Sequence, residues 1–534
     1  MNRKAYLFLL LLVITSFFVH RSALPPDIME QRNLVTAREM STEGHWLLPT
    51  MNGNLRLEKP PLPTWVAGVV DCVAPHHLVA QRFMSGIMAT AWLVFFFLFV
   101  RDLSGRDRLA FLSALIFLTM YQTVLMGRSA TWDIYCHAFM MGGIFYLERG
   151  LTRKSNEQWK WFPAAGAMMG LSFLSKGPVS FYALLLPVLI ATVGMGSLTL
   201  KDKWPAFFLM VVLVLLIGGS WYVWLLTQYG TQTMAIIHQE TGAWGHHNVR
   251  PWYYYWRFFA ETGIWAFVML AALAVSYWKR TLQDTRTYLF SITWTLAALV
   301  LLSLMPEKKY RYLLPMMPAC SLCIACLMDD FVETRDKVHQ LLYRIQGWLT
   351  TLLFCGIGVA LPFLPVMSLA LRIVLSITFV FLAVNAAYTT RQQLPLRLTA
   401  NIAVAFMLAE CFLIKPVGKV FGKDLPHSIV KVDAVPQVKS LPFYHPKQEP
   451  IRIKLVYLAG RKILPVSLDD STAVVRATPF VLVTEHPAHT YFPQGSLYSN
   501  LHMRTIARYD DNTHPMGDKG YKQNLVSYVT IITR

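Results

Sequence analysis

The chain has 534 residues, of which 55% are hydrophobic and only 15% are charged. With a mean hydropathy of +0.41, this composition excludes an ordinary soluble globular protein. The net charge of +19 would suggest nucleic-acid binding in a soluble protein. In a membrane protein, Lys and Arg instead gather in cytoplasmic loops and near anionic lipid, so we expect no nucleic-acid partner.

Thirteen apolar runs are long enough, or nearly long enough, to cross a membrane. The first follows Met-Asn-Arg-Lys and has the features of a signal-peptide core. Because no clear cleavage site follows it and many further runs do, we interpret it as the first span. The predicted spans cover residues 5–21, 83–100, 109–126, 134–148, 161–175, 178–197, 205–226, 263–277, 288–305, 311–328, 347–365, 367–388 and 398–415.

The charges of the loops predict the orientation of these spans. Placing Arg3 and Lys4 in the cytoplasm gives every cytoplasmic loop at least two Lys or Arg, and an odd number of spans places the C-terminus outside. The outside segments should then be poor in positive charge, yet 22–82, 227–262 and several short turns carry many charged side chains. We interpret these charges as a site for an anionic substrate group.

The character of the chain changes near residue 416. The segments "IRIKLVYLAG", "TAVVRATPFVLVTE" and "LVSYVTIITR" predict strands, and about 120 residues suffice for a small α/β domain. We therefore expect a transmembrane domain at 1–415, with a long first loop at 22–82, and a soluble domain at 416–534 outside the membrane.

The cysteines predict neither a metal site nor a disulfide framework. Cys320, Cys323 and Cys326 have the spacing of metal ligands, but they lie in the apolar run "PMMPACSLCIACLM" with no fourth ligand nearby. We expect them to be small buried side chains of a helix.

The first outside loop opens with "LPPDIMEQRNLVTAREM", which predicts a short helix starting near Asp27. Asp27 and Glu30 fall on one helical face, where two acids could act as general bases or hold a metal. The alternative is a purely structural pair, in which Asp27 caps the helix and Glu30 complements its dipole.

Five further stretches outside the predicted spans carry candidate functional residues. "RLEKPPLPTW" holds Glu58 and Lys59 in a proline-stiffened stretch. "RSATWD" contains Arg128 and Asp133, and "LSKGP" contains Lys176; interfacial anchoring or snorkelling is the alternative for these residues.

The segments "GHHNVRPWYYYW" and "PEKKYRYLLP" complete the set. His246 and His247 could bind a metal if further ligands, such as Glu58, lie nearby. The cations around Arg311 and Tyr312, set among aromatic residues, suit a phosphate carried by a lipid or a sugar. The convergence of weak signals on one face predicts a lipid-facing site that handles a phosphate.

These motifs, in this order, resemble the GT-C membrane glycosyltransferases, and in particular the aminoarabinose transferases that modify lipid A, which are related to the protein O-mannosyltransferases. The resemblance covers residues 25–320 and is carried by "EQRNLVTAREM", "WLLPTMNGNLRLEKPPLPTW", "RSATWD", "LSKGP", "HHNVRPWYYY" and "KKYRYLLP". It implies about thirteen spans, a periplasmic C-terminal domain and a multi-pass protein of the bacterial inner membrane whose active site faces the periplasm.

The resemblance also implies roles for individual residues. Glu58 with His246 or His247 would hold a divalent metal such as zinc, and no nucleotide cofactor is expected. The donor phosphate would meet Lys59, Lys176, Arg311 and Tyr312, and we add Arg128 to this set. Asp133 would correspond to the acid of the second outside loop.

One departure from the family pattern concerns the first loop. The family carries an adjacent Asp-Glu pair there, which falls on Met29-Glu30 in this chain. Either Asp27 substitutes through a shifted turn or Glu30 alone does the acid–base work, so the catalytic set is Asp27, Glu30 and Asp133.

We therefore predict a monomeric transferase that moves a sugar from a polyprenyl (undecaprenyl) phosphate to an acceptor on the periplasmic face, with the phosphate of lipid A as the favoured acceptor. The alternatives are a transferase of the same superfamily that acts on protein or another surface glycan, and a flippase of lipid-linked sugar. A flippase would be expected to show internal repeats and mid-membrane charges, and the sequence has neither.

Overall fold

The structure is a computed structural model that describes residues 3–153, 155–196, 200, 202–246, 248–333, 336–365, 367–421, 427–492, 498 and 500–534. It divides into two compact units. The helical unit comprises Met1–Arg21, Leu57–Pro63 and Arg82–Pro416, and the mixed unit comprises Ser22–Arg56, Thr64–Gln81 and Val417–Arg534.

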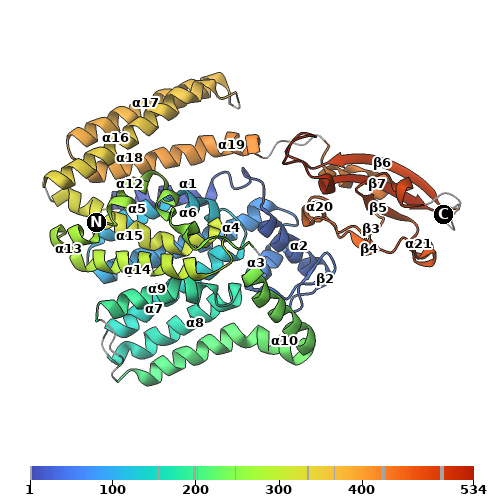
Figure 1. The fold of residues 1–534 in the computed structure, drawn as a ribbon, viewed down its shortest axis with the longest axis horizontal. Helices are drawn as coiled ribbons and strands as arrows, with labels where there is room; N and C mark the ends of the chain where they lie inside the picture. Colours follow the sequence, from blue (N-terminus) through green and yellow to red (C-terminus); the bar gives the residue numbers. More distant parts are fainter. Residues whose placement is uncertain are drawn as a thin grey trace. The chain divides into compact units, whose positions relative to one another are not determined.

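The chain before the C-terminal tail is almost entirely helical (Figure 1). Apart from α2, its helices are α1 (Arg3–Phe18), α3 (Leu62–Val73), α4 (Leu78–Ser104), α5 (Asp107–Leu118), α6 (Tyr121–Gly127), α7 (Trp132–Thr152), α8 (Gln158–Lys176), α9 (Leu186–Gly194), α10 (Trp204–His246), α11 (Phe258–Glu261), α12 (Ala266–Ala271), α13 (Val275–Thr281), α14 (Thr285–Leu304), α15 (Met317–Glu333), α16 (Lys337–Ala360), α17 (Leu369–Arg391), α18 (Pro395–Leu408) and α19 (Ile414–Phe421). Short 3₁₀ and π segments join several of them, including η2 (Phe181–Leu185), η3 (Trp252–Tyr255) and η5 (Tyr310–Met316).

Seven of the described helices are long and apolar enough to cross a membrane, or eight if the bent pair α5–α6 forms one span. They comprise Leu78–Ser104, Trp204–Ile236, Thr285–Leu304, Tyr310–Glu333, Lys337–Phe363, Leu369–Arg391 and Pro395–Val420. The prediction of a multi-pass helical membrane protein is therefore confirmed, whereas the count of thirteen spans stays a prediction. Helices α1, α7 and α8 occupy three of the other expected ranges, but they are too short or too polar to qualify on their own.

The expected span at 263–277 is not a single helix. The structure breaks it into a 3₁₀ turn at Gly263–Trp265, α12 and α13, with turns at residues 272–274. The sequence there is Ala-Leu-Ala, which contains no proline or glycine, so tertiary packing and not a local breaker ends α12. In contrast, Cys320, Cys323 and Cys326 are buried in α15 as predicted.

Helices α7, α8 and α10 pack side by side in the helical unit (Figure 1). Glycines allow α8 and α10 to approach closely. A Cβ atom added at Gly166 would lie 2.6 Å from the carbonyl oxygen of Met210, and one at Gly170 would lie 2.7 Å from the Cβ of Ile217. Because α7 connects to α8 through a short link and packs against it, the two helices run antiparallel, and the start of α7 meets the end of α8.

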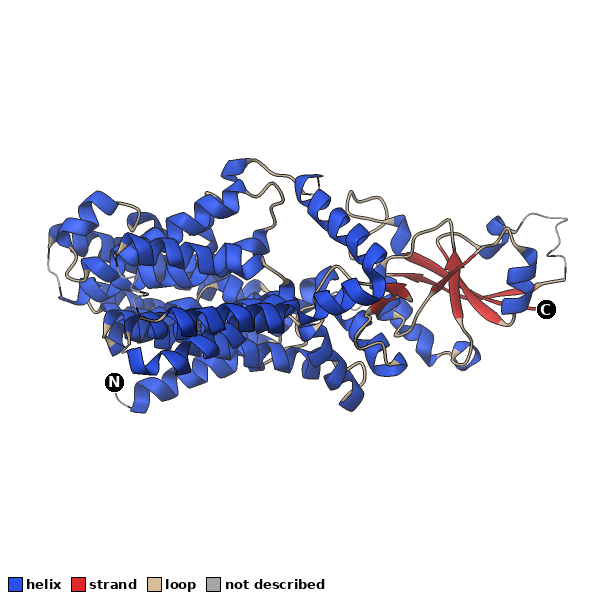
Figure 2. Cartoon of the chain, turned by 90° about the horizontal axis from the view of Figure 1, so that it is seen from below, coloured by secondary structure: helices blue, strands red, loops and turns tan. Residues whose placement is uncertain are grey.

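The tail of the mixed unit forms a five-stranded mixed sheet, shown in red in Figure 2. Its strands are β3 (Phe443–Pro446), β4 (Leu464–Val466), β5 (Phe480–Thr484), β6 (His502–Asp510) and β7 (Val526–Thr533), in the order β4-β3-β5-β7-β6. Strand β3 pairs in parallel with β4 and β5, while β7 is antiparallel to β5 and β6. Alternate residues of β5 enter two separate cores, so this central strand is buried on both faces.

Helix α2 (Ile28–Glu43) and the hairpin β1–β2 (Thr50–Met51 and Asn54–Leu55) belong to the same unit as this sheet. Val35 of α2 lies in the apolar core on one side of the sheet. Asn52, in the hairpin turn, exchanges two hydrogen bonds of 2.7 and 2.8 Å with the backbone of Ile463. The first outside loop is thus tied to the tail by packing and by paired hydrogen bonds.

Two of the three segments expected to be strands differ in the structure. "LVSYVTIITR" forms β7 as predicted, and the second half of "TAVVRATPFVLVTE" forms β5, but its first half is helix α21 (Ser471–Ala477). "IRIKLVYLAG" contains helix α20 (Ile453–Leu458). Its buried residues Leu455, Val456 and Ala459 lie on one helical face, so the apolar spacing fitted a helix as well as a strand.

Candidate active site

The centre of the candidate site is a buried ion pair between Asp133 and Lys176. Asp133 lies in the first turn of α7 and Lys176 is the last residue of α8, so the antiparallel packing of these helices brings them together. Their side chains are only 5% and 10% exposed. Each charge also complements the helix end on which it lies, negative at an N-terminus and positive at a C-terminus. Two predicted residues from separate outside turns therefore meet.

A second group of charges surrounds the ring of Tyr312. The ammonium groups of Lys176 and Lys309 each lie 5.6 Å from the centre of this ring, within the range of a cation–π contact. The Tyr312 hydroxyl donates a hydrogen bond of 3.3 Å to Glu307, which also pairs with Lys309 at 2.5 Å. The charge of Arg311 acts on Asp133. These contacts link α7, α8 and η5 into one cluster of cations and carboxylates.

The two outside segments rich in aromatic and basic residues pack against each other. The backbone N–H of Lys308 donates to the carbonyl of Asn248 at 3.1 Å, and that of Arg250 donates to the carbonyl of Pro306 at 3.3 Å. The Tyr255 hydroxyl accepts from the N–H of Lys309 and donates to its carbonyl, both at 3.0 Å. This double contact fixes the backbone from which the Lys309 side chain extends toward Tyr312.

The adjacent lysines 308 and 309 have different roles. The Lys308 ammonium is buried and donates to the backbone carbonyls of Arg250 and Met305, and burial lowers the pKa of Lys308. Lys308 therefore holds the two segments together, whereas Lys309 belongs to the charge cluster. The neighbouring aromatic side chains of Trp252, Tyr253 and Trp256 are more than half exposed, as expected for a membrane-interface belt.

Arg128, expected to contact the donor phosphate, is engaged elsewhere. Its two terminal nitrogens donate 2.6 Å hydrogen bonds to the carbonyls of Thr15 and Val19 at the end of α1. Only 3% of the residue is exposed. An arginine that satisfies the free carbonyls of a helix C-terminus has a structural role, namely to hold α1 against the bundle.

Asp27 and Glu30 lie in the mixed unit, at the start of α2. One carboxylate oxygen of Asp27 accepts the backbone N–H groups of Met29 and Glu30 at 2.9 and 2.8 Å. This is the capping arrangement that the sequence offered as the alternative to catalysis. Glu30 is 1% exposed, in the first turn of the helix.

The residues expected to hold a metal are only partly described. Glu58 is exposed and Lys59 is half-buried, just before Pro60. His246 ends α10, but its side chain lies outside the described part of the chain, as does all of His247. Among the described residues, no three His, Cys, Asp or Glu side chains group as a metal site. The described residues thus do not test whether the set fits a metal, and the metal stays a prediction.

Sequence reasoning counted Lys309 only among the outside cations and gave Glu307 no role. Both lie in the quoted segment "PEKKYRYLLP", where an acid directly before two lysines was a usable signal for an internal ion pair. A further hydrogen bond that was not anticipated, of 2.7 Å from the Gln122 side chain to the carbonyl of Tyr310, anchors the start of η5.

Known proteins resemble this chain in sequence and in fold. A family model described as dolichyl-phosphate-mannose-protein mannosyltransferase matches residues 58–224. The crystal structure of ArnT from Cupriavidus metallidurans bound to undecaprenyl phosphate superposes with a TM-score of 0.72, over 98% of this chain and 97% of that one, at 17% identity. The chain has the fold of this ArnT, and over residues 58–224 it is similar to a glycosyltransferase family.

Two named relatives are similar to this chain in sequence. The chain is 24% identical over 357 residues to the undecaprenyl phosphate-alpha-4-amino-4-deoxy-L-arabinose arabinosyl transferase of Pectobacterium atrosepticum, and 25% identical over 374 residues to the second such enzyme of Proteus mirabilis. These alignments span 60% and 65% of the two enzymes' lengths. The prediction of a membrane glycosyltransferase related to the mannosyltransferases is supported by the family model and by the named relatives, and the predicted fold by the superposition.

Proposed function

We propose that this aminoarabinose-transferase-like protein moves a sugar from a polyprenyl phosphate to a phosphate of lipid A on the periplasmic side of the inner membrane. The observation that carries the proposal is the buried Asp133–Lys176 pair beside Tyr312 and Lys309. The likeness to arabinosyl transferases named for an undecaprenyl phosphate donor supports the substrate class. The orientation of the charged loops supports the periplasmic side.

In the proposed reaction, an oxygen of the acceptor phosphate attacks the anomeric carbon of the donor sugar. A new carbon–oxygen bond forms there, and the bond from that carbon to the donor phosphate oxygen breaks. The electron pair leaves with the polyprenyl phosphate, whose negative charge increases by one, while the acceptor phosphate loses one negative charge. Because a phosphate acceptor is already an anionic nucleophile, no proton acceptor is required and positioning dominates the rate.

Lys176 and Arg311 are proposed to stabilise the charge that develops on the departing phosphate. Cations held in a partly buried site stabilise such charge more strongly than solvated ones. Asp133 keeps Lys176 in place before the donor binds, and Tyr312 gives the ammonium an aromatic face to lie against. Lys59 is proposed to contact the same phosphate.

If the acceptor is instead a hydroxyl group, it must lose a proton, and we assign Glu30 to accept it. A divalent metal such as zinc, if held by Glu58 with His246 or His247, would supply further neutralisation of phosphate charge. The remaining roles do not depend on it.

The test is a transfer assay with the full-length protein in liposomes that contain undecaprenyl-phosphate aminoarabinose and lipid A. We expect lipid A to gain the mass of one aminopentose on a phosphate. Lys176→Met should abolish the gain, whereas Lys337→Met, an exposed lysine at the start of α16, should leave it intact. A matched assay with a periplasmic protein extract tests the protein acceptor that the mannosyltransferase family model suggests.

Mass spectrometry of lipid A from cells with and without the gene gives the corresponding result in vivo. Unchanged lipid A together with labelled protein or surface glycan would overturn the acceptor but keep the transferase. No transfer to any acceptor from any polyprenyl-phosphate sugar, with folded protein, would overturn the proposed function altogether.

A further inference from the structure

We propose that the helical unit carries a second lipid site, which binds a phospholipid whose headgroup contains both a phosphate and a primary ammonium. The site consists of two adjoining cavities of about 360 and 370 Å³, each within the size range of small-molecule sites. Three leucines, Leu147, Leu151 and Leu189, line both cavities, so the two are neighbours. The proposal does not depend on the proposed glycosyl transfer.

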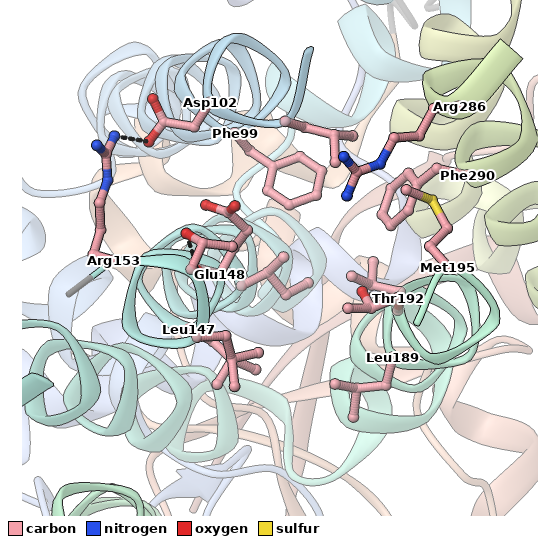
Figure 3. Close-up of a pocket in the computed structure, with 15 residues that line it drawn as sticks. Phe99, Asp102, Leu147, Glu148, Arg153, Leu189, Thr192, Met195, Arg286 and Phe290 are labelled. Carbon is pink, nitrogen blue, oxygen red and sulfur yellow. Dashed lines mark hydrogen bonds and ion pairs between the residues drawn. The ribbon is translucent and has the colours of Figure 1, made fainter. Parts of the chain in front are cut away.

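The first cavity has charged side chains on facing walls (Figure 3). Arg286, in the first turn of α14, directs its guanidinium inward between the rings of Phe99 and Phe290. Asp102 and Glu148 lie on the other side, at the ends of α4 and α7. Two arginines, Arg286 and Arg153, and two carboxylates thus line the same space, whose remaining lining is mainly apolar.

The two carboxylates of this cavity are not equivalent. Asp102 pairs with Arg149 at 2.6 Å and with Arg153 at 3.9 Å, so its charge is already balanced. Glu148 has a buried Oε2 atom that accepts no hydrogen bond from the described part of the protein. A buried carboxylate oxygen without a donor is costly, and a ligand ammonium would satisfy it.

The second cavity is lined only by apolar side chains among the described residues. They come from α7, α8, η2, α9 and α10, together with Leu200, which precedes α10. Two of its lining residues on α10, Val211 and Leu215, are 38% and 66% exposed. Helix α10 buries little of its apolar span within the protein, so this wall faces lipid. An acyl chain from the surrounding bilayer is the ligand that fits an apolar cavity opening toward lipid.

The two charged side chains and the apolar cavity together select the ligand. A phosphate would lie at Arg286, an ammonium at Glu148 and one acyl chain in the apolar cavity. A phosphatidylethanolamine-type lipid has all three groups in that order. A lipid with a purely anionic head would leave the Glu148 carboxylate facing a negative charge, which is unfavourable.

This site lies far from the Asp133–Lys176 pair. Glu148 is fifteen residues after Asp133 on α7, which corresponds to about 22 Å along a helix. The loops at this end carry the charges that predict the cytoplasmic side. The phospholipid would therefore come from the cytoplasmic leaflet, where it would brace α4, α7, α9 and α14 against one another.

The experiment is native mass spectrometry of the purified full-length protein after exchange into nanodiscs with equal parts of phosphatidylethanolamine, phosphatidylglycerol and phosphatidylcholine. We expect the wild type to retain phosphatidylethanolamine in preference to the other two. Arg286→Gln should lower retention of all phospholipids about tenfold, the equivalent of one charge-assisted hydrogen bond. Glu148→Gln should remove the preference for the ammonium headgroup while keeping lipid binding.

A matched pair on α10 tests the apolar cavity. Val211→Trp fills it and should expel the lipid, whereas Val223→Trp, on the same helix but lining neither cavity and 61% exposed, should not. If a variant fails to fold, a phosphatidylethanolamine with a photoreactive acyl chain, added to the wild type, should label α10 between residues 207 and 215. Equal retention in wild type and Glu148→Gln, absence of labelling there, or displacement of the lipid by added undecaprenyl phosphate would each overturn the proposal.

Discussion

Replacing Asp133 and replacing Lys176 should lower the free energy of unfolding by different amounts. Both side chains are at most 10% exposed, so removing one partner leaves a buried charge, which costs about 3–5 kcal/mol. After Lys176→Met, Asp133 still has the charge of Arg311 nearby, which places the loss near the lower figure. After Asp133→Asn, Lys176 and Arg311 have both lost their shared anion, which places the loss near the upper one.

The double variant provides the decisive comparison. With both charges removed, neither buried charge is left unbalanced, so the loss should be smaller than that of either single variant. Reversible unfolding in mixed micelles of increasing denaturing detergent, followed by far-UV circular dichroism, gives the three free-energy differences. A coupling of about 2 kcal/mol or more is expected. Losses that add within about 0.5 kcal/mol would refute the reasoning, because they would show that the pair is solvated.

Three further predictions concern the mixed unit and the metal. Asn52→Ala removes two buried hydrogen bonds to Ile463 and should lower the free energy of unfolding by about 2–3 kcal/mol, measured by thermal unfolding and by faster proteolysis of the first loop, whereas the exposed neighbour Asn54→Ala should change little. Burial raises the pKa of Asp511 above its unfolded value, so its contribution to stability is present at acid pH and is lost as the pH rises through the folded pKa; Asp511→Asn should flatten this fall in stability, which begins above the ordinary pKa of an aspartate. If Glu58 is a metal ligand, chelation should lower transfer, and Glu58→Gln should reduce the bound metal measured by plasma mass spectrometry; an unchanged metal content would remove Glu58 from the site.

Most of the membrane-spanning helices could be predicted from the sequence, because a long apolar run has one dominant cause, the need to cross the hydrocarbon core of the bilayer. Ranges such as 83–100 and 205–226 fall within single helices of the structure. The break at 272–274 was not accessible, since none of the residues Ala-Leu-Ala there disfavours a helix by itself. The strand predicted at 451–460 failed for a related reason, because its apolar residues fit both periodicities.

The candidate site was only partly accessible for a different reason. The chemistry of Asp133, Lys176 and Tyr312 could be inferred from charges in outside turns, but their partners depend on which helix ends meet. Arg128 had the same local signal as Lys176, yet it binds the end of α1, more than a hundred residues earlier. Likewise, nothing local indicated that the hairpin at Asn52 would share a unit with Ile463 in the tail.

The two roles open to Asp27 can be separated, because the structure shows one of them in detail. Its carboxylate caps α2 by accepting two backbone N–H groups, and asparagine performs this task about as well as aspartate. Asp27→Asn should therefore keep both stability and transfer, while Asp27→Ala should lower the free energy of unfolding by about 1 kcal/mol through loss of the cap. Loss of transfer in a stable Asp27→Asn variant would contradict the capping role and assign the proton transfer to Asp27. The same assay with Glu30→Gln then discriminates the acceptor: activity that survives fits a phosphate nucleophile, whereas activity that disappears fits a hydroxyl whose proton Glu30 must take.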